Sequence, residues 1–307
     1  MVTGGAGFIG SHIIQRLLQQ KHDVICLDNF DPYYNPALKL QNIVKFQSDS
    51  HFKLIKGDIL DKKIIKSVLT DVEYIFHEAA QSGVRISVDN AMKSHEKNAT
   101  GTLTILETAR HFNVKKIINA SSSSVYGKVE YLPFDEKHPT VPVSPYGVSK
   151  LMTEHYCRVY EELFGLKSVS LRYFTVYGPG MRPDLAINIF THKALKNQPI
   201  VIFGDGNKTR DFTYVDDIVD ANMLAMKNGS GVYNVGGGHR VTITDLAEKI
   251  IEITNSSSKI IYNDPVPGDA LHTFANTELI RKDLGWNPKT DLDVGLTRYT
   301  EWVSTFQ

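Results

Sequence analysis

The stretch Thr3-Gly4-Gly5-Ala6-Gly7-Phe8-Ile9-Gly10 decides the fold that this chain adopts. Its glycines have the GxxGxxG spacing, and they lie between a short apolar run, Met1–Thr3, and a segment with apolar residues at helical spacing, Gly10–Gln20. Glycines at such a strand-to-helix turn let the backbone approach a pyrophosphate closely, and the amides that open the helix face that anion. Because glycine turns also serve packing, the stretch alone is a weak sign of a dinucleotide site.

Asp28 strengthens this sign, because it follows a second apolar run, Asp23–Leu27, about 20 residues after the glycines. A carboxylate at this place can accept hydrogen bonds from the ribose hydroxyls of an adenosine, whereas the alternative is a simple turn former after a strand. The next residues, Asn29 to Pro32, include no arginine that could receive a ribose 2′-phosphate. The pattern therefore favours NAD over NADP as the cofactor.

Short apolar runs alternate along the chain with amphipathic segments of helical length. The expected strands are residues 23–27, 52–56, 74–77, 116–120 and 168–173, and the clearest helices are residues 10–20, 98–112 and 146–164. This alternation predicts an α/β fold of the Rossmann type, a doubly wound parallel sheet with helices on both faces.

The pattern loosens after Tyr173 into turn-rich sequence, which predicts a smaller C-terminal α/β region. We expect the strand 231–235 to return to the first sheet, and the chain to end in a helix, 243–253, and a tail. The first, nucleotide-binding domain then comprises residues 1–174 with about 212–235, and the second comprises 175–211 with 236–307.

Composition excludes several classes of partner. The chain has 307 residues, and its 34 basic residues balance 34 acidic ones, so no net charge draws it to nucleic acid or to an anionic membrane surface. Cys26 and Cys157 make no disulfide framework and predict packed free thiols in a reducing compartment. The histidines show no ligand spacing, and we expect no metal site.

The N-terminus runs directly into the glycine turn, without the basic and apolar regions of a secretion signal. No apolar stretch approaches the roughly 18 residues that would suggest a membrane span. We therefore expect a soluble, cytoplasmic protein. Met1–Thr3 is short for a central strand, so we also expect one or more residues to be missing from its front.

Tyr146 and Lys150 form the second group of chemically informative residues. They lie four residues apart at the start of a predicted helix, so the ammonium can approach the phenol and lower its pKa toward that of a useful base. Ser121 to Ser124 follow the predicted strand 116–120, where hydroxyls reach the crevice that binds ligands. Alone, the first pair could be a solvated helix face and the serines a polar loop.

These motifs together resemble the extended short-chain dehydrogenases/reductases, specifically the NAD-dependent nucleotide-sugar epimerases. The resemblance spans essentially the whole chain. Besides the motifs above, it rests on Gly57-Asp58-Ile59, His77-Glu78-Ala79-Ala80, Asn98, Ser122 to Gly127, Leu171 to Pro179, Arg210-Asp211-Phe212, Val215-Asp216-Asp217, Tyr233 to Gly236 and Pro267-Gly268-Asp269.

The resemblance implies a role for each matching position. Ser122, Tyr146 and Lys150 would be catalytic. The cofactor would lie against Gly4, Gly7, Phe8, Ile9, Asp28, Asn29, Asp58, Ile59, Ala79, Ala80, Gln81, Asn98, Tyr146, Lys150, Tyr173 and Val176. The nucleotide-sugar substrate would lie against Val84, Arg85, Ser122, Ser123, Thr175, Arg182, Asn188, Val201, Phe203, Arg210 and Asp269, with Arg210 on its diphosphate. The family also implies a homodimer built on helices 98–112 and 146–164.

The reaction is chosen among family members that all oxidise a sugar at C4. Where the 4,6-dehydratases carry an Asp-Glu pair, this chain has Ser123 and Ser124, and where the uronate decarboxylases carry a glutamate it has Ser124. This comparison leaves epimerisation at C4 of a UDP-sugar through a transient 4-keto intermediate. Thr175, where many hexose 4-epimerases have asparagine, and the run Arg182-Pro183-Asp184 favour UDP-glucuronate.

Several alternatives to this function stay open. The substrate could be UDP-glucose/UDP-galactose or an N-acetylhexosamine, and the chain could instead be a UDP-glucuronate decarboxylase or a sugar dehydratase. A non-catalytic NAD-binding regulator is a further alternative, although such chains typically lose the tyrosine or the lysine, and both are present here.

Overall fold

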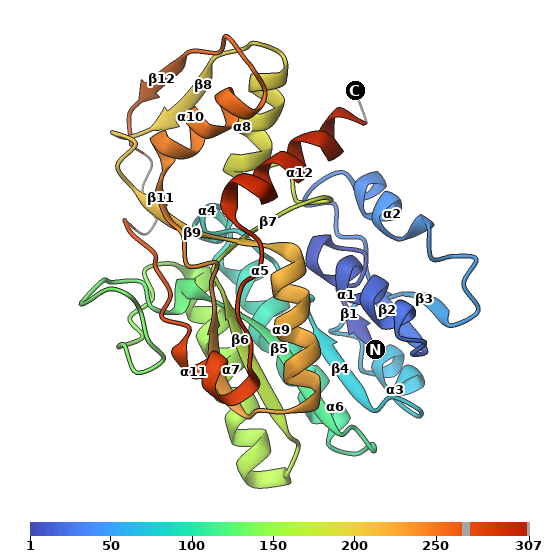
Figure 1. Ribbon diagram of the computed structural model, residues 1–307. Coiled ribbons are helices and arrows are strands. Elements are labelled where there is room, and N and C mark those ends of the chain that lie inside the picture. The colour runs from blue at the N-terminus through green and yellow to red at the C-terminus, as the bar shows by residue number, and fades with distance from the viewer. Residues whose placement is uncertain (266–270, 306–307) are drawn as a thin grey trace.

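A parallel sheet of seven strands forms the centre of the computed structural model, which describes residues 1–265 and 271–305 (Figure 1). Within these residues, neighbouring strands follow the order β10-β6-β5-β4-β1-β2-β3. The bounds are β1 (Val2–Thr3), β2 (Val24–Asp28), β3 (Phe52–Lys56), β4 (Tyr74–His77), β5 (Lys116–Ser122), β6 (Ser168–Tyr173) and β10 (Gly231–Val235). All pairings in this sheet are parallel, which confirms the predicted doubly wound α/β fold.

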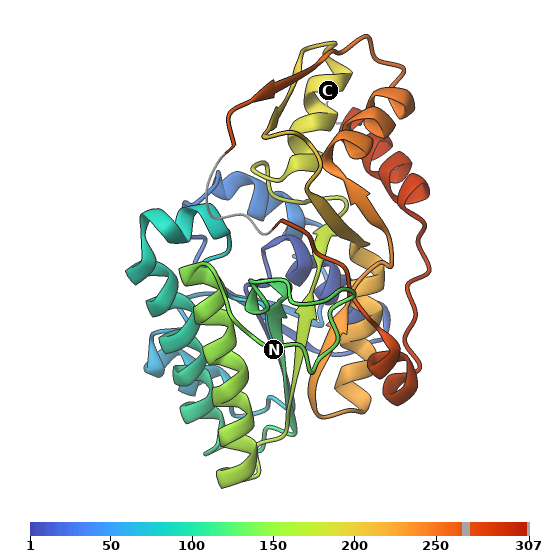
Figure 2. The same ribbon diagram turned by 90° about the vertical axis from the view of Figure 1, so that its left-hand side faces the viewer.

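Helices cover both faces of this sheet (Figure 2). On one face lie α1 (Phe8–Gln19) and α9 (Val215–Lys227), which pack on each other, and α11 (Glu278–Leu284) packs beside β10. On the other face lie α3 (Lys62–Val68), α6 (Gly101–Ala109) and α7 (Pro145–Phe164). Separate apolar clusters fill the two faces, and the free thiols of Cys26 and Cys157 are buried in one each, as predicted.

The sequence around α7 explains why this helix is long and well defined. The Ser144 side chain accepts a hydrogen bond from the Gly147 amide, and Pro145 occupies the first turn, where its missing N–H costs nothing. At the other end Gly165 takes the left-handed conformation with φ of 68°, which ends the helix. These caps fix the turn of α7 that carries Tyr146 and Lys150.

The predicted helix 98–112 is shorter than expected. The regular part is α6, and a π-helical turn, Glu96–Thr100, precedes it after α4 (Val84–Asp89) and α5 (Ala91–His95). The hydroxyl of Thr102, in the first turn of α6, donates to the carbonyl oxygen of Asn98 in this π-helical turn. Such widened turns shift the side chains that follow them relative to a regular helix.

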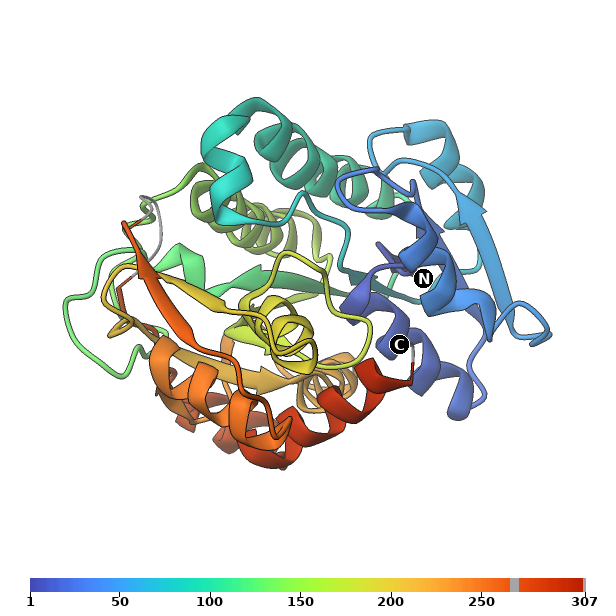
Figure 3. The same ribbon diagram turned by 90° about the horizontal axis from the view of Figure 1, so that it is seen from above.

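The smaller region lies beyond the carboxyl ends of the large sheet's strands and is at the top of Figure 1. One of its sheets contains β7 (Thr175–Tyr177), β9 (Thr209–Tyr214) and β11 (Arg240–Thr242), and the other pairs β8 (Ile200–Phe203) with β12 (Ile260–Asn263). Its helices are α8 (Ala186–Leu195), α10 (Ile243–Ile253) and α12 (Leu292–Ser304), which enclose an apolar core of their own. From above, α8 lies between α10 and α12 on one side and α4 and α5 on the other (Figure 3).

Two predictions about the second half have opposite outcomes. The strand 231–235 returns to the large sheet as β10, parallel to β6, as predicted. The expected tail after residue 253 is wrong, because this segment forms β12, α11 and α12. Leu292, Leu296, Tyr299 and Val303 lie on the buried face of α12, which docks the C-terminal segment onto the smaller region. The division into two domains stays a prediction.

None of the helices in the described parts of the chain is both long enough and apolar enough to cross a membrane.

Candidate active site

A cavity of about 740 Å³ lies where the carboxyl ends of the large sheet's strands meet the smaller region. Its lining includes the glycine turn before α1, the ends of β2, β4, β5 and β6, and residues of β7, α8, β8 and β9. The strand order reverses at β1, whose neighbours are β2 and β4, and ligands of doubly wound sheets bind at such a reversal. The cavity is therefore placed as a cofactor and substrate site would be.

The glycine turn is a cradle that side chains would fill. A Cβ on Gly10 would lie 2.4 Å from the Gly4 carbonyl oxygen, and one on Gly4 would lie 2.7 Å from the Ala79 amide nitrogen. Gly4 also has φ of +65°, which favours glycine. No side chain caps the first amides of α1 after Gly7. The turn thus leaves room at a helix N-terminus for the pyrophosphate of a dinucleotide, and it fits NAD.

Asp28 is held beside this turn. Its Oδ2 accepts a hydrogen bond from the Ala6 amide at 3.1 Å, and its Oδ1 accepts one from the Phe30 amide at 2.8 Å. The buried Lys39 ammonium lies 3.7 Å from Asp28 Oδ1. The carboxylate therefore faces the cavity in a fixed orientation, as a ribose-binding group must.

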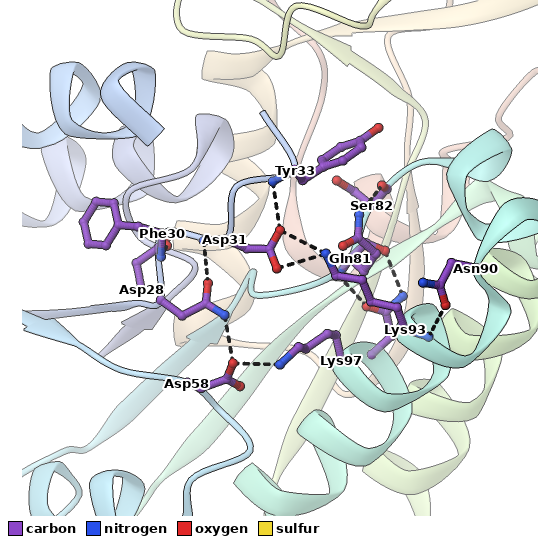
Figure 4. Close-up of polar contacts among 12 residues, drawn as sticks. Asp28, Phe30, Asp31, Tyr33, Asp58, Gln81, Ser82, Asn90, Lys93 and Lys97 are labelled. Carbon is purple, nitrogen blue, oxygen red and sulfur yellow. Dashed lines mark hydrogen bonds and ion pairs between the residues drawn. The ribbon is translucent and has the colours of Figure 1, made fainter. Parts of the chain in front are cut away.

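Ion pairs join the loops after β2 and β3 to the helical segments beyond β4 (Figure 4). Lys97 Nζ lies 2.7 Å from Asp58 Oδ2, and Lys93 Nζ lies 3.1 Å from Asp31 Oδ2. The Asn29 side-chain amide donates a hydrogen bond to Asp58 Oδ2 at 2.8 Å. Burial raises the pKa of Asp58, but the hydrogen bonds from Lys97, the Leu60 amide and Asn29 outweigh it and lower the pKa overall. Asp58 thus remains a charged acceptor in the cavity lining.

Ser122, Tyr146 and Lys150 come together from β5 and α7. Tyr146 and Lys150 lie one helical turn apart and both line the cavity, and Lys150 Nζ donates to the Ala120 carbonyl oxygen at 2.6 Å. Burial, the largest effect, raises the pKa of Tyr146 overall, although its hydrogen bond with Ser122 and the charge of Arg182 oppose this shift, so the lowered pKa expected from Lys150 is not found. Burial lowers the pKa of Lys150, and the carboxylates of Glu78 and Glu154 oppose this shift.

Glu78 is a cavity residue that the sequence analysis quoted only within a motif and assigned no role. It directly follows β4, and its Oε1 accepts a hydrogen bond from the Tyr173 hydroxyl at 2.9 Å. Burial raises the pKa of Glu78 to about 7, although the hydrogen bond from Tyr173 and the charge of Lys150 oppose this shift. No local signal marks this residue, because its partners come from β6 and α7.

The predicted substrate side of the cavity carries three arginines, Arg85, Arg182 and Arg210. The Arg85 guanidinium lies 5.7 Å from the centre of the Phe203 ring, which joins α4 to β8. Arg182 contacts Ser82 and forms an ion pair with Asp184 at 3.0 Å. Also lining the cavity are Val84, Ser123, Thr175, Val201 and Arg210.

Three predicted residues are not brought into this lining. Asn98 is buried, its amide donates to the Gln81 carbonyl oxygen and to Ser149 Oγ, and its Oδ1 accepts from the Gln81 amide at 2.7 Å. It therefore shapes the cavity through Gln81. The Asn188 amide points instead to the Tyr299 hydroxyl at 2.7 Å, and Asp269 lies outside the described residues. The remaining predicted cofactor residues line the cavity: Gly7, Phe8, Ile9, Ile59, Ala79, Ala80, Gln81 and Val176.

One cavity brings together a glycine turn at the start of α1, a carboxylate at the end of β2 and a Ser–Tyr–Lys group. These features define a class of enzyme, the extended short-chain dehydrogenases/reductases. The comparison with known families gives the particular one. Residues 1–236 match the NAD dependent epimerase/dehydratase family, and the chain belongs to this family.

Relatives named for two different sugars resemble the chain to a similar extent. A UDP-glucuronate 4-epimerase of Thermodesulfobacterium geofontis is 35% identical, over 98% of this chain and 95% of its own. The solved structure of UDP-glucuronic acid 4-epimerase from Bacillus cereus, in complex with UDP-glucuronic acid and NAD, is 36% identical, with a TM-score of 0.95 over 100% of this chain and 99% of that one. The structure of UDP-glucose 4-epimerase from Thermotoga maritima with UDP-glucose is 35% identical, with a TM-score of 0.93 over 99% and 98%.

Proposed function

We propose that this protein is an NAD-dependent epimerase that inverts C4 of a UDP-sugar through a transient 4-keto intermediate. The observation that carries the proposal is the convergence of Ser122, Tyr146 and Lys150 on the cavity that also holds the glycine turn and Asp28. Relatives of full length that are named UDP-sugar 4-epimerases support it.

The chain's own residues can perform the proton transfers that this reaction needs. Tyr146 takes the proton of the C4 hydroxyl and later returns it to the same oxygen, while Ser122 holds that oxygen by a hydrogen bond. Lys150 stabilises the Tyr146 phenolate by its charge, and the Ala120 carbonyl oxygen fixes the ammonium. NAD bound against the glycine turn and Asp28 would supply the hydride acceptor and donor that inversion at C4 requires.

Different residues of the cavity are candidates for binding the diphosphate and the sugar of the substrate. Arg210, on β9, is the candidate for the diphosphate, since guanidinium groups bind such anions through paired hydrogen bonds. Ser123 and Thr175 offer hydroxyl groups on the sugar side. With the nucleotide held at its diphosphate, the 4-keto sugar can turn between the two hydride transfers.

We infer that the preferred sugar is a uronate, UDP-glucuronate or UDP-galacturonate. The supporting observation is that Thr175 and two cations, Arg85 and Arg182, line the cavity together, which suits a sugar carboxylate. UDP-glucose/UDP-galactose is the second candidate, because the relative from Thermotoga maritima carries that name with a similar likeness.

Mass and charge of the products separate these possibilities. We would incubate the protein with NAD and, separately, UDP-glucuronate, UDP-glucose and UDP-N-acetylglucosamine, and analyse each by anion-exchange chromatography with mass spectrometry. An isomer of unchanged mass from the uronate is the expected result. Conversion of the neutral sugars alone would refute the uronate preference, and loss of water or of carbon dioxide would refute epimerisation.

Tyr146→Phe tests the assigned base. Removing a general base typically costs about 10²–10⁴-fold in rate. Tyr156→Phe is the matched control, since it removes a phenol hydroxyl from the same helix at a position outside the cavity lining. Equal activity of the two variants would contradict the assignment.

We also propose a homodimer, from the family resemblance, and a cytoplasmic location, which the free, buried thiols of Cys26 and Cys157 support. Light scattering after size-exclusion chromatography tests the first, and a monomer at micromolar concentration would contradict it.

A further inference from the structure

The Glu78 carboxylate lines the cavity and its charge acts on Tyr146 and Lys150, yet the proton transfers above do not use it. It directly follows β4, and its backbone is fixed, because the Glu78 amide donates to the Thr3 carbonyl oxygen at 3.2 Å. A Cβ on Gly4 would meet the peptide that joins Glu78 to Ala79 at 3.0 Å or less. The carboxylate is thus attached directly beneath the glycine turn of the cofactor site.

Its side chain is also held in place. The Tyr173 hydroxyl donates to Glu78 Oε1 at 2.9 Å, and the Asn222 amide, from α9, donates to that hydroxyl at 2.8 Å. Three elements therefore orient the Glu78 carboxylate. The end of β4 fixes its backbone, and the hydrogen bonds through Tyr173 on β6 and Asn222 on α9 hold its side chain. Such an arrangement points the charge in a fixed direction rather than leaving it to solvent.

The charges that face Glu78 come from the catalytic helix. Lys150 and Glu78 each perturb the pKa of the other, and the charge of Glu78 also acts on Tyr146. Glu78, Tyr146 and Lys150 therefore share one weakly solvated part of the cavity. The nicotinamide must lie in this part, because C4 of the sugar has to face that ring while its hydroxyl reaches the Tyr146 phenol.

We propose that the Glu78 carboxylate supplies the negative charge that favours the oxidised, positively charged nicotinamide over the reduced, neutral one. This inference rests on the proposed function. Its consequence is chemical: an epimerase must return the hydride, and a site that stabilised the reduced ring would strand the 4-keto sugar. A fixed carboxylate beside the ring opposes that outcome.

The measurable quantity is the ratio of the dissociation constants for NADH and NAD, which sets how far the protein shifts the redox equilibrium of the bound cofactor. A unit charge several ångströms away in a partly desolvated site can change an equilibrium by about tenfold or more. For this two-electron couple, tenfold corresponds to about 30 mV. Glu78→Gln keeps an acceptor for Tyr173 but removes the charge, so we expect the ratio to fall about tenfold.

We would titrate each purified protein with NADH at pH 8, follow its fluorescence, and displace it with NAD. Glu73→Gln is the matched control, because it removes the same charge at the other end of β4, where Glu73 is exposed and paired with Lys115. This control should change the ratio less than twofold, as should Glu78→Asp, which retains a carboxylate.

The outcomes distinguish this inference from the proposed function. An unchanged ratio in Glu78→Gln, or an equal change in Glu73→Gln, would overturn the role of the charge while leaving the epimerase proposal intact. Failure of the wild-type protein to bind either nucleotide would overturn both. If Glu78→Gln does not fold, Glu78→Met provides the same comparison with a side chain of similar length.

Discussion

Replacing Arg172 by methionine should destabilise the fold by about 3–5 kcal/mol, because it leaves the Glu154 carboxylate buried without its cation. Arg172 Nε and Nη2 donate to the two oxygens of Glu154 at 2.9 and 2.7 Å, and the side chains are only 6% and 5% exposed. Arg172 lies on β6, and Glu154 lies on α7, one helical turn after Lys150. Ser121 on β5 donates a further hydrogen bond to the Glu154 carboxylate. The Glu154 carboxylate therefore joins the strand that ends in Ser122 to the helix that carries the proposed base.

The size of the effect follows from what remains after the substitution. Glu154 keeps its bond from Ser121, and Tyr126 loses the donor that Arg172 Nη1 provides at 2.9 Å. Replacing both partners by apolar residues, Arg172→Met with Glu154→Leu, removes the unpaired charge and should recover most of the loss, since buried pairs are often close to neutral overall. The interaction energy from this double-mutant cycle should be about 2–3 kcal/mol.

Urea unfolding followed by circular dichroism measures the cycle. With an m-value of roughly 3 kcal/mol/M, the single variant should unfold about 1 M earlier than the wild type. Arg158→Met is the control, since Arg158 and Glu162 form a pair on the same helix with side chains that are 60% and 57% exposed, and such a pair contributes about 1 kcal/mol or less. An Arg172→Met loss no larger than that of the control would refute the reasoning.

Three further predictions concern the cofactor site and its neighbourhood. Gly10→Ala should weaken NAD binding at least tenfold, because its Cβ would lie 2.4 Å from the Gly4 carbonyl oxygen, and calorimetric titration showing unaltered affinity would contradict this. Asp28→Asn should shift cofactor selectivity toward NADP at least tenfold. The Lys39 ammonium lies 3.7 Å from Asp28 and would be left to attract a ribose 2′-phosphate. Competitive binding of NAD and NADP measures the selectivity, and an unchanged preference would count against this prediction. Burial and the charge of Lys150 lower the pKa of His77 to about 3, so below about pH 6.5 the unfolded chain binds a proton that the folded one refuses, and stability should fall by about 1.4 kcal/mol per pH unit as the pH drops toward 3. Urea midpoints between pH 7 and 5 should decline less steeply in His77→Gln, and equal slopes would show that His77 does not titrate in this way.

The sequence predicted those parts of the protein whose signals are local. The strands 52–56, 74–77 and 231–235 have the predicted bounds, because each is a short apolar or β-branched run that ends at polar or turn-forming residues. The glycine turn and Asp28 belong to one contiguous strand–helix–strand unit, so their spacing alone placed them at one end of the sheet.

The C-terminal segment was missed although part of its signal is local. Leu292, Leu296, Tyr299 and Val303 follow each other at intervals of three or four residues, which is helical spacing. The strand β12 gives a weaker signal, because most of it is exposed and, among the residues that the structure describes, it pairs only with β8, about 60 residues earlier. Its existence depends on a tertiary contact that sequence spacing does not reveal.

The predictions for Asn98 and Glu78 show the same limit within the site. The Asn98 amide is used by Gln81 and Ser149, and only the folded chain shows that these groups come within reach of it. Glu78 gains its surroundings from β6 and α7, which follow it by about 70 to 95 residues. Residues that act through such partners require the fold before a role can be assigned.

The late return of β10 makes the two parts of this protein inseparable at any single peptide bond. The chain leaves the large sheet after β6, builds β7, α8, β8 and β9 of the smaller region, and only then adds the edge strand that covers β6. During synthesis on a ribosome, the edge of β6 therefore stays uncovered until residue 235 has emerged. A hybrid enzyme that takes its sugar pocket from a relative would accordingly need several joins, one after β6 and others around α9 and β10.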